Sequence, residues 1–273
     1  MKKLLLSSAA MLFVAGSALA ADLPSRKGPP PAYLPPPPML TWNGFYVGLN
    51  VGYGFSASNG STYGYETFNG APTGLAWAYS QPNLNGVVGG GQVGYNWQFA
   101  NSFVAGLEAD IQGADLSGAS SGVSNNIGYA AVLATHQRLD WYGTVRGRLG
   151  YLFTPTLLVY GTGGFAYGQG SSRFAYADTV GFTAGGFESD TRTGWTAGAG
   201  LEWMFAPNWS AKVEYLYTDL GRGQGFAVPQ LNPAGALTNF ASIQTPVQNR
   251  FHTVRAGLNY HFNWGAVPVV AKY

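Results

Sequence analysis

Residues 194–221, GWTAGAGLEWMFAPNWSAKVEYLYTDLG, decide the fold of this chain. Apolar or aromatic side chains take every second position in both halves: Trp195, Ala197, Ala199, Leu201, Trp203 and Phe205, then Trp209, Ala211, Val213, Tyr215 and Tyr217. Polar side chains, among them Glu202, Lys212 and Glu214, take positions in between. Such alternation is typical of a half-buried strand, and the short segment 206–208 between the halves predicts a tight hairpin.

Six further stretches alternate in the same way, so the sequence predicts eight strands. They cover residues 44–55, 91–99, 103–113, 139–151, 157–168 and 254–262, and only the glycine-rich 157–168 has an ambiguous facing. The connections are tight at 100–102, 154–155 and 206–208, and long at roughly 56–85, 114–138, 169–190 and 221–249. Long and tight connections alternate strictly. No proline falls in a predicted strand, where it would remove a ladder hydrogen bond.

The composition is unlike that of a water-soluble domain. Charged residues are 10% of the chain and aromatic residues 15%, whereas about a quarter of a typical soluble chain is charged. The aromatics form two groups. Near the tight connections lie Trp42, Trp97, Phe99, Phe103, Tyr151, Phe153, Trp203, Phe205, Trp209, Tyr260, Phe262 and Trp264; near the long ones lie Tyr53, Trp141, Tyr167, Trp195, Tyr215 and Tyr217. Two aromatic belts are typical of a barrel that crosses a membrane.

We therefore predict an all-β fold, a closed eight-stranded antiparallel transmembrane β-barrel with three short periplasmic turns and four long extracellular loops. Closure is required because a sheet edge in hydrocarbon would leave backbone groups unpaired, at several kcal/mol each. The chain has no cysteine, so we expect neither disulfides nor thiolate sites.

Both ends of the chain are predicted to lie outside the barrel. Residues 1–20 join a basic start, an apolar run and small residues at Ala18 and Ala20, which is typical of a cleaved secretory signal peptide. Residues 21–41 hold eight of the 16 prolines and are expected to form an extended periplasmic tether. The barrel is expected over residues 42–262, followed by a periplasmic tail at 263–273.

The polar faces of the strands carry a balanced set of charges. An eight-stranded barrel is only wide enough for side chains to fill, and buried charges need partners. We predict one lumen network of four acidic and four basic side chains, Glu108, Asp110, Arg146, Arg148, Glu202, Lys212, Glu214 and Arg255. It is expected to plug the barrel and set its register; the alternative is a narrow ion path.

Counting from the tight turns suggests partners within the lumen network. Glu108 and Asp110 come level with Arg148 and Arg146. Phe205 opposite Trp209 would place Glu202 opposite Lys212, and Glu214 and Arg255 lie at similar depth.

Other motifs are weak. Residues 89–94, GGGQVG, match a dinucleotide-binding pattern but run into a strand instead of a helix. His136, His252 and His261 are too scattered for a metal site, and His252 beside Thr253 is the only candidate for rim chemistry. We predict no enzyme activity and no catalytic, metal or cofactor site. Without Lys2 and Lys3, twelve of the 14 basic side chains remain against 12 acidic ones, so no nucleic-acid partner is expected.

The blocks GFYVGLNVGYGF, GGGQVGYNWQF, FVAGLEADIQGADLSG, YGTVRGRLGY and HTVRAGLNYHF, with the opening stretch, resemble the small eight-stranded outer-membrane proteins of alphaproteobacteria, which are similar to OmpA-like and opacity-protein-like barrels. The resemblance covers Trp42 to Phe262. It implies an abundant envelope protein, a surface antigen in some members, haem binding in a few, and "porin" as a loose label. Since no peptidoglycan-binding domain follows the barrel, direct wall anchoring is not expected.

The final strand matches an assembly signal of the resembling family. Its pattern, polar-x-Gly-x-x-aromatic-x-aromatic, is filled by Arg255, Gly257, Tyr260 and Phe262. The resemblance implies recognition by the barrel assembly machinery.

We predict a protein of the cell outer membrane with a structural, envelope-integrity and surface-interaction role. The alternatives are a narrow passive pore and a surface adhesin or haem-type binder that acts through its loops. Expected partners are outer-membrane lipid, lipopolysaccharide, the barrel assembly machinery and an unknown cell-wall or surface ligand.

Overall fold

The computed structural model describes residues 40–57, 61–68, 71–126, 129–222, 227–243 and 248–262. The predicted signal peptide, all but the end of the predicted tether, and the predicted tail lie outside these residues and stay predictions. No helix in the described part of the chain is long and apolar enough to cross a membrane.

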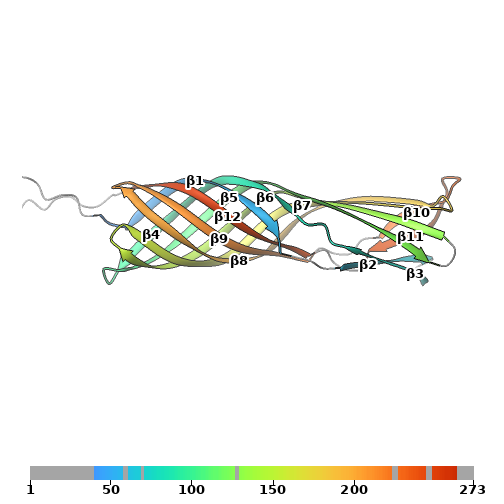
Figure 1. The fold of residues 1–273 in the computed structure, drawn as a ribbon, viewed down its shortest axis with the longest axis horizontal. Coiled ribbons are helices and arrows are strands. Elements are labelled where there is room, and N and C mark those ends of the chain that lie inside the picture. Colours follow the sequence, from blue (N-terminus) through green and yellow to red (C-terminus); the bar gives the residue numbers. More distant parts are fainter. Residues whose placement is uncertain are drawn as a thin grey trace, which may run out of the picture. The chain divides into compact units, whose positions relative to one another are not determined.

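Eight antiparallel strands close into a ring, which confirms the predicted fold class (Figure 1). They are β1 (Gly44–Ser56), β4 (Asn85–Phe99), β5 (Phe103–Asn126), β6 (Tyr129–Thr154), β7 (Leu157–Asp178), β8 (Thr183–Ala206), β9 (Trp209–Arg222) and β12 (Gln248–Phe262). The ring runs β8–β7–β6–β5–β4–β1–β12–β9, and β9 pairs back to β8. Within the ring, each of these strands has a hydrogen-bonded neighbour on both sides, so the ring leaves no edge toward lipid.

Side chains alternate between the outside and the inside of the ring. In β1, Leu49 is 73% exposed whereas Asn50 is buried. The ambiguous strand follows the same rule, because Val159 and Phe165 of β7 point outward and Tyr160 points inward. The outer face is thus apolar, as suits a surface covered by lipid.

Aromatic rings contact one another along the outside near the tight turns. The ring centroids are 5.7 Å apart for Trp97 and Phe99, 5.8 Å for Phe99 and Phe103, and 5.3 Å for Phe103 and Tyr151. This chain of contacts crosses β4, β5 and β6, in line with an aromatic belt at the membrane interface.

The three tight connections are short turns, as predicted. They lie at residues 100–102, 155–156 and 207–208. In the first, Ala100 and Asn101 adopt left-handed φ values of 47° and 62°. Asparagine tolerates this region well, and a residue in it helps to reverse the strand direction sharply.

The long connections contain strands where the sequence predicts loops. β5 and β6 stay paired as far as Asn126 and Tyr129, and β7 and β8 as far as Ala177 and Thr183. The other two long connections hold the hairpins β2 (Ser61–Phe68)–β3 (Ala71–Ser80) and β10 (Ala227–Leu231)–β11 (Leu237–Ile243). The prediction that these four connections are loops was wrong because it depended on outward-facing apolar residues, and their alternation ends near the aromatic belt. The strands continue beyond the belt through backbone hydrogen bonds.

Two prolines lie inside these additional strands. Pro72 is the second residue of β3, which is the end strand of the hydrogen-bonded order. Pro229 lies in β10 next to β11, whereas β10 pairs with β8 only at Gln230 and Leu231. Among the described residues, each proline therefore pairs with a neighbouring strand on one side only. On its other side no ladder hydrogen bond is needed, so the missing N–H costs little there.

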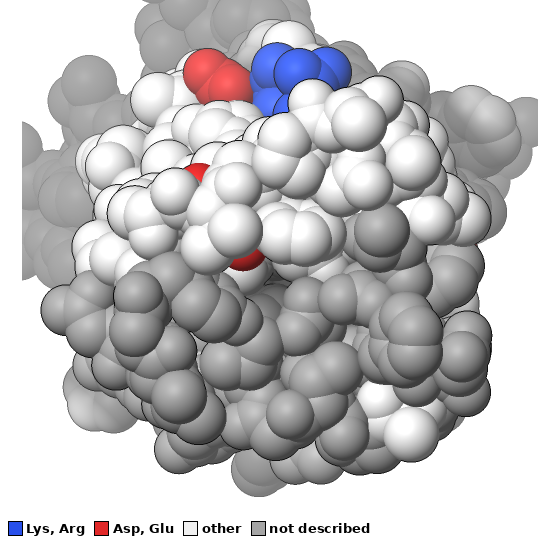
Figure 2. All heavy atoms as spheres, turned by 90° about the vertical axis from the view of Figure 1, so that its right-hand side faces the viewer, with Lys and Arg blue, Asp and Glu red and all other residues white. Residues whose placement is uncertain are grey.

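The additional strands form a second wall facing the extended β5–β8. Their order is β3–β2–β11–β10–β8, and β3 also lies against β5. Between the walls, Leu133, Phe174, Tyr176 and Ala184 belong to one buried apolar cluster. Seen from the end where β2, β3, β10 and β11 lie, most of the described surface is uncharged (Figure 2). Basic and acidic side chains lie together at one edge, and further acidic atoms are visible nearer the middle of the face.

Candidate functional site

The structure brings all eight residues of the predicted lumen network together inside the ring, and all are buried. Five of the eight barrel strands contribute: β5 (Glu108, Asp110), β6 (Arg146, Arg148), β8 (Glu202), β9 (Lys212, Glu214) and β12 (Arg255). With four cations and four carboxylates the lumen network is neutral when every group is ionised.

Glu108 lies at the centre of the lumen network. Lys212 Nζ donates to both of its carboxylate oxygens at 2.9 Å. Arg146 donates to Oε1, and the Tyr46 hydroxyl donates to Oε2 at 2.6 Å. The guanidinium groups of Arg148 and Arg255 each lie 3.6 Å from one oxygen of the Glu108 carboxylate. The cations compensate the cost of burying this carboxylate.

Asp110 and Glu214 share two arginines. Arg146 reaches Asp110 Oδ2 and Glu214 Oε1, each at 3.0 Å. Arg255 Nη2 reaches the same Asp110 oxygen at 2.8 Å and Glu214 Oε2 at 2.6 Å. Each arginine bridges carboxylates on different strands, so this part of the network ties β5, β6, β9 and β12 together.

Glu202 anchors the part of the network nearest the tight turns. Arg148 Nη2 donates to its Oε2 at 2.5 Å. Its Oε1 accepts from the Ser210 hydroxyl at 2.6 Å and from Asn259 Nδ2 at 2.7 Å. His261 Nε2 lies 2.8 Å from the Ser210 oxygen. Both oxygens of the Glu202 carboxylate therefore accept hydrogen bonds from side chains of other strands.

The register of β8 and β9 agrees with the prediction inside the barrel, at Glu202 and Lys212, but not beside the tight turn. Glu202 lies opposite Lys212, as predicted. The predicted pairing of Phe205 with Trp209 is wrong, because a bulge places Ala206 opposite Trp209. Lys212 also donates across the lumen to Glu108 instead of to its register partner.

The register of the other charged strands agrees in part. Glu214 lies opposite Arg255, as predicted. Glu108 lies opposite Arg146, however, and not opposite Arg148. β5 and β6 follow two different tight turns and are joined to each other only at the hairpin end, so counting from those two turns did not fix their relative stagger.

Two tyrosines complete the lumen network and were not predicted. The Tyr46 hydroxyl accepts from Arg148 Nη1 at 2.9 Å, and the Tyr160 hydroxyl donates to Glu214 Oε1 at 3.0 Å. The guanidinium of Arg148 lies 4.0 Å from the centroid of the Tyr160 ring. Alternation would have found Tyr46, which shares a face with Asn50, but the ambiguous facing of β7 concealed Tyr160.

Two strand glycines make room for these tyrosine rings. Tyr46 lies opposite Gly94, and Tyr160 opposite Gly200. A Cβ at Gly94 would lie 2.3 Å from the Tyr46 ring, and one at Gly200 would lie 2.6 Å from the Tyr160 ring. Gly94 closes the GGGQVG motif, which lies within β4 and serves strand packing here.

An apolar cluster closes the lumen at the tight-turn end. This turn-side plug comprises Trp42, Val104, Leu152, Leu158, Tyr160 and Met204. Trp42 was predicted in the outer belt, but it is only 1% exposed and lies inside. It precedes β1 and so escapes the strand alternation. Its Nε1 donates to the Pro155 carbonyl at 3.0 Å, which holds the indole across the opening.

A second apolar cluster closes the other end of the lumen. This hairpin-side plug comprises Leu84, Val88, Ala114, Leu116, Leu139, Tyr142, Ala166, Leu220 and Phe251. The rings of Tyr142 and Phe251 meet edge to face with centroids 5.3 Å apart. Their strands, β6 and β12, lie opposite each other in the ring, so this contact spans the lumen.

The weak candidate for rim chemistry is contradicted by the structure. Thr253 is buried inside the barrel, whereas the His252 ring lies outside with its Nδ1 2.6 Å from the Tyr215 hydroxyl. Neighbouring strand residues point to opposite faces, so the two cannot act together. Among the described residues, no group of three or more His, Asp or Glu side chains is arranged to hold a metal ion.

The predicted assembly-signal residues all lie in β12. Arg255 faces the lumen network, and Gly257 lies opposite Lys212. Tyr260 packs on the outside against Trp209 and Phe262, with centroids 5.2 and 5.1 Å apart. Recognition of this strand by the assembly machinery stays a prediction.

The model of the outer membrane protein beta-barrel domain matches residues 6–262 of this chain. The chain belongs to this family. A "31 kDa outer-membrane immunogenic protein" of Brucella melitensis is 38% identical over 263 residues, which cover 96% of this chain and 100% of the relative. A "22 kDa outer membrane protein" of Rhizobium leguminosarum bv. viciae is 35% identical over 191 residues, 68% of this chain and 67% of the relative. The chain is a protein of the cell outer membrane.

Solved structures similar to this chain are outer-membrane proteins of low sequence identity. OprG of Pseudomonas aeruginosa is 11% identical with a TM-score of 0.42, and the match covers 81% of this chain and 97% of OprG. Neisserial surface protein A is 12% identical with a TM-score of 0.34, and the match covers 80% and 97% of the two chains.

Proposed function

We propose that this outer-membrane barrel is a sealed, non-enzymatic structural protein that stiffens the envelope and presents its long hairpins at the cell surface. The observation that carries the proposal is the filling of the lumen. The neutral lumen network lies between the turn-side plug and the hairpin-side plug, and each of the three layers contains contacts that run across the barrel.

The lumen network favours a structural role over conduction. The bond from Lys212 on β9 to Glu108 on β5 joins opposite sides of the ring. A passing ion would have to displace such a bond and strip its own water between the two apolar plugs. Both steps are costly in a water-excluding interior.

Planar-bilayer recording of the refolded full-length protein tests this proposal. We expect no steady current from the wild type, while an unheated sample still runs as a compact species on a gel. A Trp42→Ala/Tyr142→Ala/Phe251→Ala variant removes large aromatic rings from both plugs. It serves as the leaky control and should show leak currents. A steady wild-type current that disappears in Arg146→Gln/Arg148→Gln would overturn the proposal in favour of a narrow pore.

Surface presentation rests on a second observation. The β7–β8 hairpin ends in an exposed turn, where Val180 is 54% exposed, and the relatives from Brucella are named immunogenic. An epitope tag inserted between Val180 and Gly181 should be bound by antibody on intact cells. A tag that is detected only after permeabilisation would contradict the orientation.

A further inference from the structure

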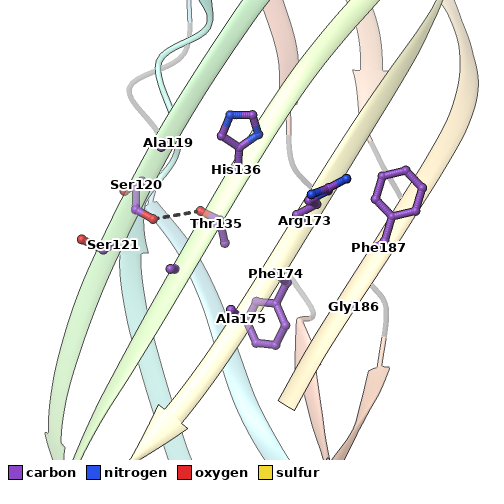
Figure 3. Close-up of a pocket in the computed structure, with 11 residues that line it drawn as sticks. Ala119, Ser120, Ser121, Thr135, His136, Arg173, Phe174, Ala175, Gly186 and Phe187 are labelled. Atoms are coloured by element: carbon purple, nitrogen blue, oxygen red, sulfur yellow. Dashed lines mark hydrogen bonds between the residues drawn. The ribbon is translucent and has the colours of Figure 1, made fainter. Parts of the chain in front are cut away.

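The outer face of the extended wall carries a row of side chains that the sealed-barrel role does not use. Register pairing places Ala119 of β5, His136 of β6, Arg173 of β7 and Phe187 of β8 side by side. All four are exposed on the outer face. Figure 3 shows the His136, Arg173 and Phe187 side chains next to one another across three strands.

This row separates two shallow grooves. The first has a volume of about 520 Å³, and small residues of the next row, Ser121, Ala134 and Ala175, form its outer floor. The second, about 540 Å³, continues toward the aromatic belt and is lined by His136, Arg138, Asp140, Ser171, Arg173 and Phe187. A ligand seated in either groove would therefore meet His136, Arg173 and Phe187.

Arg173 is available to an anion. Its guanidinium lies 5.4 Å from the centroid of the Phe187 ring. Within the part of the chain that the structure describes, it takes part in no ion pair. Arg138 in the same wall is occupied by Asp140 at 2.9 Å and Asp115 at 3.5 Å. An arginine fork that lies beside a ring and has no carboxylate partner suits bidentate binding of phosphate.

The height of the row above the membrane narrows the choice of ligand. Trp141 and Tyr167, with centroids 5.9 Å apart, belong to the aromatic belt near the long hairpins. His136 lies five residues beyond Trp141 along β6. At about 3.3 Å per residue and a tilt of about 40°, this puts the row roughly 13 Å above the belt. Sugars of a glycolipid head group reach this height, whereas acyl chains do not.

We propose that His136, Arg173 and Phe187 bind the phosphorylated sugar head group of a glycolipid in the same leaflet, of the lipopolysaccharide class. Arg173 takes the phosphate, and the faces of Phe187 and His136 pack against sugar rings. The proposal rests on the outer-membrane location and not on the sealed lumen, so a conducting barrel would leave it intact.

Binding of purified lipopolysaccharide to the full chain in phosphatidylcholine nanodiscs tests the proposal. We expect Arg173→Gln to raise the apparent Kd by about tenfold or more, the loss that follows from removing hydrogen bonds between two charged groups. Arg250→Gln is the matched control, because it removes an equal charge from an arginine that already pairs with Asp219 at 2.9 Å, outside both grooves. Its Kd should equal that of the wild type, and heat-shifted gel mobility should show both variants folded.

Two further ligands locate the interaction. Dephosphorylated lipopolysaccharide should bind the wild type with the same raised Kd that intact lipopolysaccharide shows for Arg173→Gln. For Arg173→Gln itself, removing the phosphates should raise the Kd no further. An equal Kd for wild type and Arg173→Gln, or a Kd that ignores the phosphates, would overturn the proposal. So would equally tight binding of the soluble phosphorylated oligosaccharide without acyl chains, because the occupant would then be a soluble glycan and not a neighbouring lipid.

Discussion

Replacing Glu108 with glutamine tests the lumen network most directly. The Glu108 carboxylate pairs with Lys212 at 2.9 Å through both oxygens, and it also accepts from Arg146 and Tyr46. The substitution keeps the shape of the side chain and leaves one positive charge without compensation in a buried space. Removing one partner of a buried ion pair costs about 3–5 kcal/mol.

At about 1.4 kcal/mol per tenfold, this cost lowers the folding equilibrium constant by roughly two to three and a half orders of magnitude. Urea titration of folding into phosphatidylcholine vesicles, followed by tryptophan fluorescence and by gel mobility, measures the loss. Asp140→Asn is the surface control. Its ion pair with Arg138 is half exposed, so we expect a loss under about 1 kcal/mol.

A double variant separates charge from packing. Glu108→Gln/Lys212→Met leaves three cations and three carboxylates in the lumen network. Replacing a whole buried pair by apolar groups is often neutral, so the double variant should recover most of the stability that the single variant loses. If Glu108→Gln costs no more than Asp140→Asn, or if the double variant is less stable than the single one, the lumen network is not a dry, mutually compensating set.

Two further predictions concern strand packing and assembly. Gly94→Ala places a methyl group 2.3 Å from the Tyr46 ring and should lower the free energy of unfolding by about 1–3 kcal/mol. Gly91→Ala on the same strand has its nearest atom at 3.7 Å and should change it by less than about 0.5 kcal/mol in the same urea titration; equal losses would refute the packing argument. Phe262→Ala or Gly257→Glu should reduce the heat-shifted band in outer-membrane fractions, whereas truncation after Phe262 should not, and the opposite pattern would place the assembly signal in the tail.

Period-two alternation sufficed to predict the eight strands and the eight charged members of the lumen network. Glu202 and Arg255 could be placed inside because a strand offers only two faces, and the lipid side excludes charge. Alternation also points inward for Tyr46. These features depend on local geometry, which a single strand already determines.

The relative stagger of neighbouring strands, and the structure beyond the lipid-covered part of the barrel, could not be predicted from alternation. The bulge beside Ala206 shifts the register at a turn, and the long connection between β5 and β6 hides the offset between Glu108 and Arg148. Trp42 lies outside any strand, so no alternation directs it into the lumen. The hairpin extensions are paired through backbone hydrogen bonds, which the side-chain sequence does not reveal, and their outward residues are less consistently apolar than those of the barrel.

The collective neutrality of the lumen network has a consequence for how this barrel can evolve. Loss of a single carboxylate such as Glu108 produces an intermediate that folds poorly, so interior substitutions become acceptable mainly when a cation is lost with it. Outward residues such as Leu49 and Val213 can drift one at a time as long as they stay apolar. The inner wall therefore changes in linked steps while the outer wall changes freely, and correlated substitution between distant strands becomes a signature of the interior.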